Sequence, residues 1–369
     1  RMQNRIIICS SPNKKSIPLY FYLLSNHLSN CGHEVIMIID QGGGMNFDNF
    51  PPNPNLKIIS WPNPRPVKFK DYFFLLRLCR SFQPDIVLSQ FSSNTISLLI
   101  SRFFPSSQFF VYWHTMQDQI LTDLKFSHFF YNLLMFRKSL VFRISNFRFL
   151  TNSNDLKKEI KSIFPFHKNE VSVLNYLMPD PSKFQVIRTF EQREYCISFV
   201  SRLDKSKGQR EFIKVFYHLL PNFPGLKLKI VGSGPELSGL IGLVEELSLQ
   251  NDVIFLGECD YQTVLYTMAN SLVHVSNSTQ EAFGMVNVEA ISLGTPILAK
   301  KVGGIKDILD PGINGEFIDV SDLDDLLRKI KHLFVADNWT SYSQSSREVF
   351  LRKFNASHEN FQNQAQVIL

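Results

Sequence analysis

Two glutamates eight positions apart, Glu281 and Glu289, enclose the sequence Ala-Phe-Gly-Met-Val-Asn-Val. The apolar run 272–276 before them predicts a strand, so Glu281 is expected in the loop at its carboxyl end. Residues 282–286 then form a first helical turn, whose free N–H groups and dipole favour an anionic or oxygen-rich ligand. Glu289 follows two turns later and is placed to accept hydrogen bonds from two vicinal hydroxyls, as on a ribose. Two solvated helix glutamates would have the same spacing.

Two basic residues follow the predicted strand 197–201, in the stretch Arg-Leu-Asp-Lys-Ser-Lys-Gly. Arg202 offers a planar fork of donors and Lys207 a point charge, and both suit a phosphate-bearing ligand. Taken alone, they could equally be ordinary surface residues. The pair therefore gains meaning only beside the two glutamates.

The segment 278–320 resembles, in order and spacing, the signature stretch of the retaining GT-B glycosyltransferases of family 4, also called glycosyl transferases group 1. The stretch 202–208 is similar to the Arg-Leu-x4-Gly segment of the same family. The resemblance is strong over 197–335 and loose over 1–176. The features that carry it are Glu281, Phe283-Gly284, Glu289-Ala290, Gly294-Thr295-Pro296, Gly303-Gly304 and Asn314-Gly315.

This resemblance implies an α/β protein with two Rossmann-like domains facing across a cleft. It implies a nucleoside diphosphate sugar as donor, retention of the anomeric configuration, and neither a cofactor nor a metal. Glu281, His114, Arg202 and Lys207 are the expected catalytic residues. Glu281 is expected to orient sugar hydroxyls rather than to act as a nucleophile. Arg202, Lys207 and the helix start assist departure of the nucleotide.

The resemblance also implies the donor-binding residues. The Gly-Ser-Gly after strand 227–231 is similar to the Val-Gly-x-Gly strand end of the family, although a Gly-x-Gly alone is typical of any tight turn. With the Gly-Glu-Cys after strand 253–256, it is expected to line the base pocket mainly with backbone. The expected donor-binding residues are Glu289, Ala282, Phe283, Gly284, Met285, Val286, Gly232, Glu258 and Cys259.

Two segments of the first half depart from the family pattern. Its first strand usually leads into a glycine-rich loop, whereas residues 10–16 contain no glycine and include a stiffening proline. Asn13 and Lys14 are the candidates for a phosphate or acceptor loop there. The usual Asn-Gly-Val-Asp appears only as the Asn-Tyr-Leu-Met of residues 175–178. Both departures concern the acceptor more than the donor. His114, at the end of strand 109–114, is assigned to the donor sugar or acceptor side, but a structural histidine is the alternative.

Short apolar strands alternate with helices along the chain, which predicts parallel sheets covered on both faces. The alternation stops at the proline-containing, charged segment 178–194 and then restarts. We therefore expect a domain over 1–177, a linker over 178–194 and a second domain over 195–354. The resemblance assigns the first domain to the acceptor side and the second to the nucleotide sugar. A helix over about 355–369 is expected to pack back on the first domain.

Charge and phenylalanine are distributed unevenly. The net charge is +6, the sum of +11 over 1–190 and −5 over 191–369, and 23 of the 34 phenylalanines lie in the first part. The stretch 125–148 holds five basic residues, no acidic residue and six phenylalanines. It is expected either to dock on an anionic membrane surface or to be a core helix with a solvated basic face.

Five scattered cysteines without a Cys-x-x-Cys pair favour reduced thiols and a cytoplasmic protein, with peripheral membrane association an option. The donor base is expected to be uridine rather than guanosine, and the acceptor a glycan, a lipid-linked sugar or a small molecule. The alternatives are a sugar-nucleotide epimerase or phosphorylase, and a nucleotide-sugar-binding protein without transferase activity. A nucleic-acid partner is not expected, because the basic half contains no nucleic-acid-binding motif.

Overall fold

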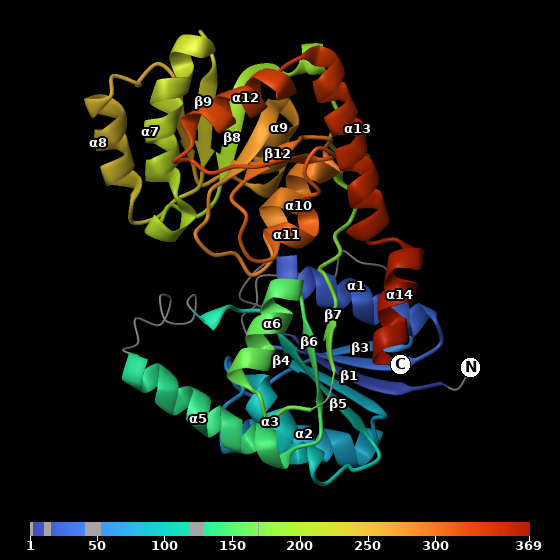
Figure 1. The fold of residues 1–369 in the computed structure, drawn as a ribbon. Helices are drawn as coiled ribbons and strands as arrows, with labels where there is room; N and C mark the ends of the chain where they lie inside the picture. Colours follow the sequence, from blue (N-terminus) through green and yellow to red (C-terminus); the bar gives the residue numbers. More distant parts are fainter. Residues whose placement is uncertain (1–2, 11–15, 41–52, 118–127, 169) are drawn as a thin grey trace. The chain divides into compact units, whose positions relative to one another are not determined.

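The structure is a computed structural model that describes residues 3–10, 16–40, 53–117, 128–168 and 170–369. The chain forms two compact units (Figure 1). Unit 1 contains residues 1–178 together with 356–369, and unit 2 contains residues 179–355. No helix among the described residues is long and apolar enough to cross a membrane.

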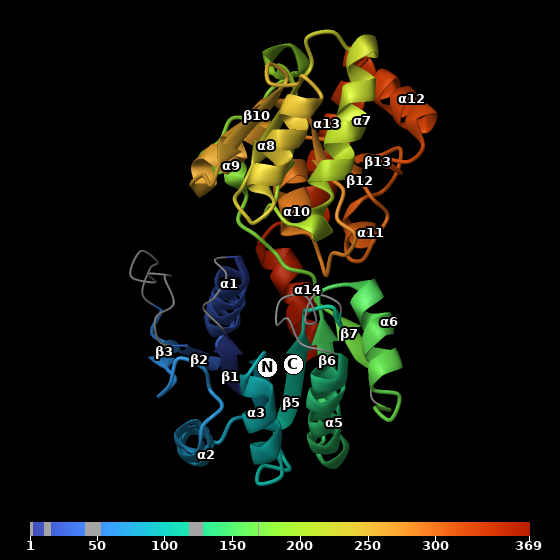
Figure 2. The same cartoon turned by 90° about the vertical axis from the view of Figure 1, so that its left-hand side faces the viewer.

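Unit 1 is built on a parallel sheet with the strand order β3-β2-β1-β4-β5-β6-β7 (Figure 2). The order reverses direction between β1 and β4, as in doubly wound nucleotide-binding folds, where ligands bind at the carboxyl ends of the strands. The strands are β1 (Arg5–Ser10), β2 (Glu34–Ile39), β3 (Leu56–Ser60), β4 (Ile86–Gln90), β5 (Gln108–Trp113), β6 (Arg148–Thr151) and β7 (Val171–Val173).

The high phenylalanine content of the first half serves the core of unit 1. Phe109 and Phe149 project from neighbouring strands and pack with Phe142, Phe147 and Phe164, which come from the helices and loops of one face of the sheet. All five are almost fully buried. The helices of this unit are α1 (Ser16–Asn30), α2 (Phe69–Phe82), α3 (Ser93–Ser101), α5 (His128–Ile144), α6 (Asn154–Ile163) and α14 (His358–Ile368).

The last helix of the chain, α14, packs on α1 of unit 1. The Tyr20 hydroxyl donates a hydrogen bond to Gln364 Oε1 at 2.8 Å, and Gln364 Nε2 donates to the Asn175 carbonyl at 2.7 Å. The ring of Phe361 stacks on His27 with centroids 5.4 Å apart. The side-chain amide of Gln364 therefore ties α14 to α1 through its oxygen and to residue 175, near the end of the first segment of unit 1, through its nitrogen.

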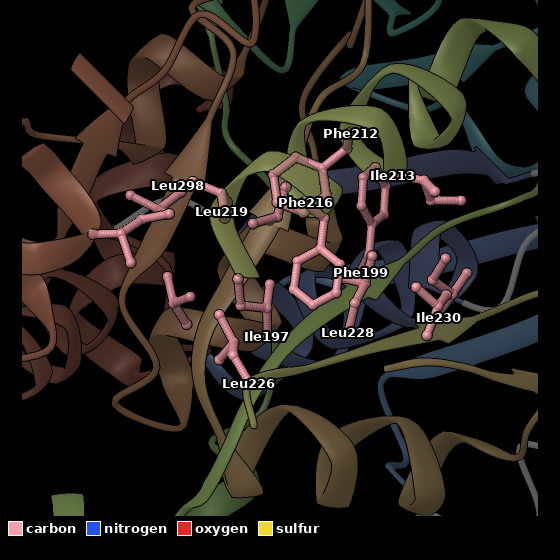
Figure 3. Packing of buried hydrophobic residues seen from close by; sticks show 14 of the residues in the cluster. Ile197, Phe199, Phe212, Ile213, Phe216, Leu219, Leu226, Leu228, Ile230 and Leu298 are labelled. Carbon is pink, nitrogen blue, oxygen red and sulfur yellow. The ribbon is translucent and has the colours of Figure 1, made fainter. Parts of the chain in front are cut away.

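Unit 2 has a six-stranded parallel sheet in the order β10-β9-β8-β11-β12-β13. Figure 3 shows its core, in which Phe199 of the central strand meets Phe212 and Phe216 from the following helix. The strands are β8 (Glu194–Val200), β9 (Lys227–Val231), β10 (Val253–Gly257), β11 (Ser271–Ser276), β12 (Ile297–Ala299) and β13 (Gly315–Phe317). The two parallel α/β sheets confirm the predicted fold class.

Helices alternate with these strands, as the sequence predicts. The α-helices are α7 (Gln209–Leu219), α8 (Leu237–Glu246), α9 (Tyr261–Asn270), α10 (Met285–Ser292), α11 (Ile305–Ile308), α12 (Leu323–Leu333) and α13 (Ala336–Lys353). Four short 3-10 helices are η2 (Pro181–Lys183), η3 (Phe190–Gln192), η4 (Lys205–Lys207) and η5 (Leu220–Asn222).

The segment 178–194 differs from the expected linker, because residues from 179 onward belong to unit 2. The buried guanidinium of Arg193 donates hydrogen bonds to the Ser271 carbonyl and to Thr295 Oγ1, at 2.8 and 2.6 Å. Asp180 forms a two-pronged ion pair with Arg347 of α13. Charged residues that suggest a solvated linker in the sequence thus anchor the segment to unit 2.

Replacing Phe361 by alanine should destabilise unit 1 by about 3–5 kcal/mol, the usual cost of removing a buried aromatic side chain. Phe361 is 4% exposed, whereas Gln366 on the same helix is exposed. Gln366→Ala is therefore the matched control and should change stability by less than about 0.5 kcal/mol. Urea unfolding followed by circular dichroism measures both, and equal midpoints for the two variants would contradict the packing of α14 on α1.

Candidate donor site

Two loops at the carboxyl edge of the unit 2 sheet are joined to each other by backbone and amide hydrogen bonds. The Thr279 N–H donates to the Ser206 carbonyl at 2.8 Å, and Asn277 Nδ2 donates to the Gly208 carbonyl at 3.0 Å. A Cβ at Gly208, whose φ is +71°, would lie 2.3 Å from the Asn277 carbonyl oxygen. The absence of a side chain at Gly208 therefore allows the loop after β8 to touch the loop after β11.

This contact brings together two predicted catalytic residues. Lys207 Nζ lies 2.8 Å from Glu281 Oε2, and the two side chains are 18% and 19% exposed. Ser278 Oγ is 3.4 Å from the same carboxylate oxygen. The ion pair thus stands at the edge of the sheet with both groups still accessible to a ligand.

The loop after β12 also contacts Glu281, through the backbone. Gly303 has a left-handed φ of +48°, and a Cβ there would lie only 1.8 Å from the Glu281 carbonyl oxygen. The Gly304 N–H donates to that same oxygen at 2.9 Å. The paired glycines after β12 therefore fix the backbone of Glu281 just before α10.

The first turn of α10 begins at Gly284, which has a φ of +97°. Ala282 and Phe283 are buried, whereas Met285 and Val286 are only partly buried. The donor-binding residues predicted over 282–286 thus divide into two that pack into unit 2 and two that stay accessible. The N–H groups of this turn precede the helix interior and are the ones that an α-helix leaves without an internal acceptor.

Glu289 occupies a different environment from Glu281. It lies on the second turn of α10 and is 7% exposed. Burial raises its pKa to about 8. Burial, and then the nearby Glu289, raise the pKa of Tyr261 at the start of α9. Glu289 is a buried acid that requires hydrogen-bond donors.

Arg202 is held apart from this ion pair. Its Nε donates to Asp204 Oδ2 at 2.7 Å, and its side chain is 60% exposed. The structure thus joins Lys207 directly to Glu281, whereas Arg202 extends into solvent from the same loop. A role for Arg202 at a diphosphate stays a prediction.

The predicted base pocket lies at the same edge of the sheet. A Cβ at Gly232, whose φ is +135°, would lie 1.9 Å from the Ser201 carbonyl oxygen. Ser233 Oγ donates to Glu258 Oε2 at 3.1 Å, and Cys259 Sγ lies 3.5 Å from the Leu256 carbonyl oxygen. Glu258 is exposed and Cys259 partly buried. The loops after β8, β9 and β10 therefore form one continuous rim.

His114 belongs to unit 1, where it follows β5 at the carboxyl edge of that sheet. It is 8% exposed, and its ring meets Phe91 edge to face with centroids 3.9 Å apart. It also lines a cavity of about 1730 Å³ within unit 1. The structure therefore gives His114 both a packed ring and access to a cavity. Asn13 and Lys14 lie outside the described residues.

Sequence reasoning missed two polar residues that build the candidate donor site. Gln209 is buried and donates to Ser201 Oγ at 2.6 Å and to the Arg202 carbonyl at 2.9 Å. Asn277 joins the loops after β8 and β11, as described above. Asn277 follows a strand, where polar residues commonly mark a site, so position alone could have indicated it. Nothing in the sequence distinguishes Gln209 from a helix surface residue.

Two family comparisons cover most of the chain. Residues 182–344 match the family described as glycosyl transferases group 1, and residues 18–175 match glycosyltransferase family 4. The chain belongs to the group 1, or family 4, glycosyltransferases. The family predicted from the motifs is thereby confirmed, and the match to 18–175 includes the half in which the sequence resemblance is loose.

Curated relatives match parts of the chain. An uncharacterised glycosyltransferase of Methanocaldococcus jannaschii is 31% identical over 181 residues, which are 46% of either chain. The N-acetyl-alpha-D-glucosaminyl L-malate synthase of Bacillus anthracis is 27% identical over 165 residues, 45% of this chain and 42% of that enzyme. The chain thus matches less than half the length of these two relatives.

Among solved structures, Anabaena HepE in complex with UDP has a similar fold over both units. The TM-score is 0.74 at 16% identity, and the alignment covers 99% of each chain. At this identity the similarity concerns the fold, and it supports the GT-B fold class with two Rossmann-like domains predicted from the sequence.

The raised pKa of Glu289 makes stability depend on pH. The folded protein binds this proton more tightly than the unfolded chain, so stability is highest below the unfolded pKa and is lost as pH rises toward about 8. The loss should reach roughly 3 kcal/mol near pH 7. Glu289→Gln should remove this dependence, measured as urea midpoints between pH 5 and pH 8. Glu258→Gln, at an exposed site, is the control, and an unchanged slope in Glu289→Gln would refute the assignment.

Proposed function

We propose that this chain transfers a sugar from a nucleoside diphosphate sugar to an acceptor, with retention of the anomeric configuration. The buried carboxylate of Glu289 is the observation that carries the proposal. Burial makes the ionised form of this acid costly, and hydrogen-bond donors that reach the carboxylate lower that cost. The vicinal hydroxyls of a ribose supply two donors at the spacing that a carboxylate accepts. The nucleotide is therefore placed against α10 of unit 2.

The diphosphate is assigned to Lys207 and the first turn of α10. Lys207 is already held at the edge of the sheet by Glu281, 2.8 Å away, so its ammonium group is positioned before the donor arrives. The helix N-terminus adds N–H donors and a favourable dipole. Charge that develops on the departing diphosphate is then stabilised by groups that need little reorganisation.

Glu281 is assigned to the donor sugar. Its carboxylate lies 2.8 Å from Lys207, to which we assign the diphosphate, and it can accept hydrogen bonds from sugar hydroxyls. Retention of configuration is proposed from the resemblance to family 4. Uridine is favoured as the base, and the UDP complex of HepE, which shares the fold, supports this choice. The proposal includes no metal ion, so transfer should survive EDTA.

Two other functions remain as outcomes of the tests. A nucleotide-sugar-binding protein without transferase activity would bind the donor but release no nucleotide, even by slow hydrolysis. A sugar-nucleotide epimerase would return an isomer of the donor without any acceptor. Transfer would instead yield a glycoside whose anomeric configuration, read by proton NMR, equals that of the donor.

UDP at about 100 times its dissociation constant should stabilise the protein by roughly 2.7 kcal/mol and raise the thermal midpoint by several degrees. GDP and ADP should do so less. Glu289→Ala and Lys207→Ala should each lose most of this shift, because they remove the ribose acceptor and the diphosphate cation.

Lys227→Ala is the matched control for Lys207→Ala. Lys227 also forms a 2.8 Å ion pair, with Asp252, but it opens β9 at the opposite edge of the sheet. The control should keep the full nucleotide shift. If no nucleotide shifts the midpoint of the native protein, the proposed donor site is wrong.

We further propose that the stretch 125–148 docks on an anionic membrane surface; residues 125–127 lie outside the described part. Four apolar side chains on successive turns of α5 are about half exposed or more, and basic residues lie among them. Apolar side chains inserted between headgroups, with basic residues at the phosphates, suit a peripheral helix. The apolar residues are Leu133, Phe136, Leu140 and Ile144, and the basic ones are Arg137, Lys138 and Arg143.

Replacing Arg137, Lys138 and Arg143 together by glutamine should weaken binding to phosphatidylglycerol vesicles by roughly a hundredfold, at about 1 kcal/mol for each basic residue. Flotation measures the bound fraction. The control replaces Lys157, Lys158 and Lys161 of α6, which removes the same charge from another helix of unit 1. Equal losses in both variants, or no vesicle binding by the native protein, would exclude docking through α5.

A further inference from the structure

The cavity of unit 1 follows the helix layer on one side of the sheet. Its lining comes from the loop before α2, the first turns of α2, the length of α3, the end of β5 and the middle of α5. Helix α3 packs against both α2 and α5 (Figure 2). From Asn94 to Leu99 the cavity follows α3 for about 8 Å, at 1.5 Å per residue, and it continues to Phe103 beyond the end of the helix. We call this cavity the α3 groove.

One end of the α3 groove is polar. His114 and Asp40 line it at the carboxyl ends of β5 and β2, and Asn94 lines it from the start of α3. Asn94 is 2% exposed, and its Oδ1 has no hydrogen-bond partner among the described residues. Neighbouring Gln90, at the end of β4, is 1% exposed with both amide atoms unpartnered in the same sense. Such buried polar groups are costly unless a ligand satisfies them.

The other end is apolar and unusually exposed. Phe69, Phe73 and Phe103 line the α3 groove and are 84%, 53% and 58% exposed. Leu99 lines it between them and is 36% exposed. Large apolar side chains that converge on one concave surface are typical of a ligand groove.

The charge of the α3 groove is strongly basic. Five basic side chains line it against the single acid Asp40, and none of the five forms an ion pair among the described residues. Lys138 is partly buried against the ring of Trp113, 4.9 Å from its centroid, and burial lowers its pKa. An anion beside Lys138 would offset that burial. The five basic residues are Arg65, Lys68, Lys70, Arg137 and Lys138.

We propose that the α3 groove binds the acceptor, and that this acceptor is an anionic amphiphile: an alkyl or isoprenoid chain along α3, a phosphate at the basic residues, and a hydroxyl-bearing head near Asn94 and His114. This inference rests on the proposed transferase function and adds the class of the acceptor. The occupant is a single lipid molecule, because the apolar residues of the groove surround a concavity. The four exposed apolar side chains of α5, Leu133, Phe136, Leu140 and Ile144, do not line it.

The test is calorimetric titration of the full chain with decyl phosphate and dodecyl phosphate, each below its critical micelle concentration. Two added methylenes should tighten binding about tenfold, because each buried methylene contributes a nearly constant increment. Dodecyl maltoside, with the same chain and no charge, and inorganic phosphate should both bind at least tenfold more weakly than dodecyl phosphate.

Matched variants locate the binding. Phe73→Ser combined with Phe103→Ser should weaken dodecyl phosphate about tenfold or more, and Lys138→Gln should weaken it by a similar factor. Phe136→Ser is the control, because Phe136 is 62% exposed on α5 but does not line the groove. All these phenylalanines are exposed, so the variants should fold, which circular dichroism checks.

Affinity that is independent of chain length, equal binding of the maltoside, or an equal loss in Phe136→Ser would overturn the proposal. A protein partner or a bilayer surface as the true occupant would leave the monomeric alkyl phosphates unbound and would overturn it as well. The titration needs no nucleotide, so its result is separate from the UDP shift of unit 2. Binding of dodecyl phosphate without a UDP shift would keep the lipid groove and remove the transferase.

Discussion

The candidate donor site depends on close backbone contact among the loops at the carboxyl edge of the unit 2 sheet. Gly208, Gly232 and Gly303 each occupy a position where a Cβ would lie between 1.8 and 2.3 Å from a carbonyl oxygen of the next loop. These distances leave no room for any other residue. The loops therefore form one rigid rim, and Lys207 and Glu281 meet because the rim places them there. Preorganised charges of this kind stabilise a developing anion with little rearrangement.

The two glutamates of the site differ because of this packing. Glu281 stands in the rim, paired with Lys207 and partly exposed, whereas Glu289 lies a few residues along α10 and is buried. The sequence spacing predicts both positions, since strand, loop and helix follow each other regularly. Spacing does not predict which carboxylate is buried, because burial depends on how α10 packs against α9 and α13 in the folded unit.

Elsewhere too, the sequence predicts features that depend on local patterns and does not predict features that depend on contacts between segments far apart in the chain. Alternating apolar strands and helices predict two parallel sheets, and the motifs predict the family, because both are local patterns. The assignment of 178–194 to a linker fails for a non-local reason: the charges of Asp180 and Arg193 find partners more than 70 residues away. The α3 groove also escapes sequence reasoning, because its lining comes from segments spread between residues 17 and 141.

The position of α14 has a consequence for biosynthesis. A ribosome completes all of unit 2 before it makes residues 358–368, yet these residues cover the Tyr20 side of unit 1. Until then α14 cannot cover α1, so an apolar face of α1 stays uncovered in unit 1 while unit 2 is translated. Unit 2 is continuous in sequence, whereas unit 1 obtains its contacts with α14 only after unit 2 has been translated.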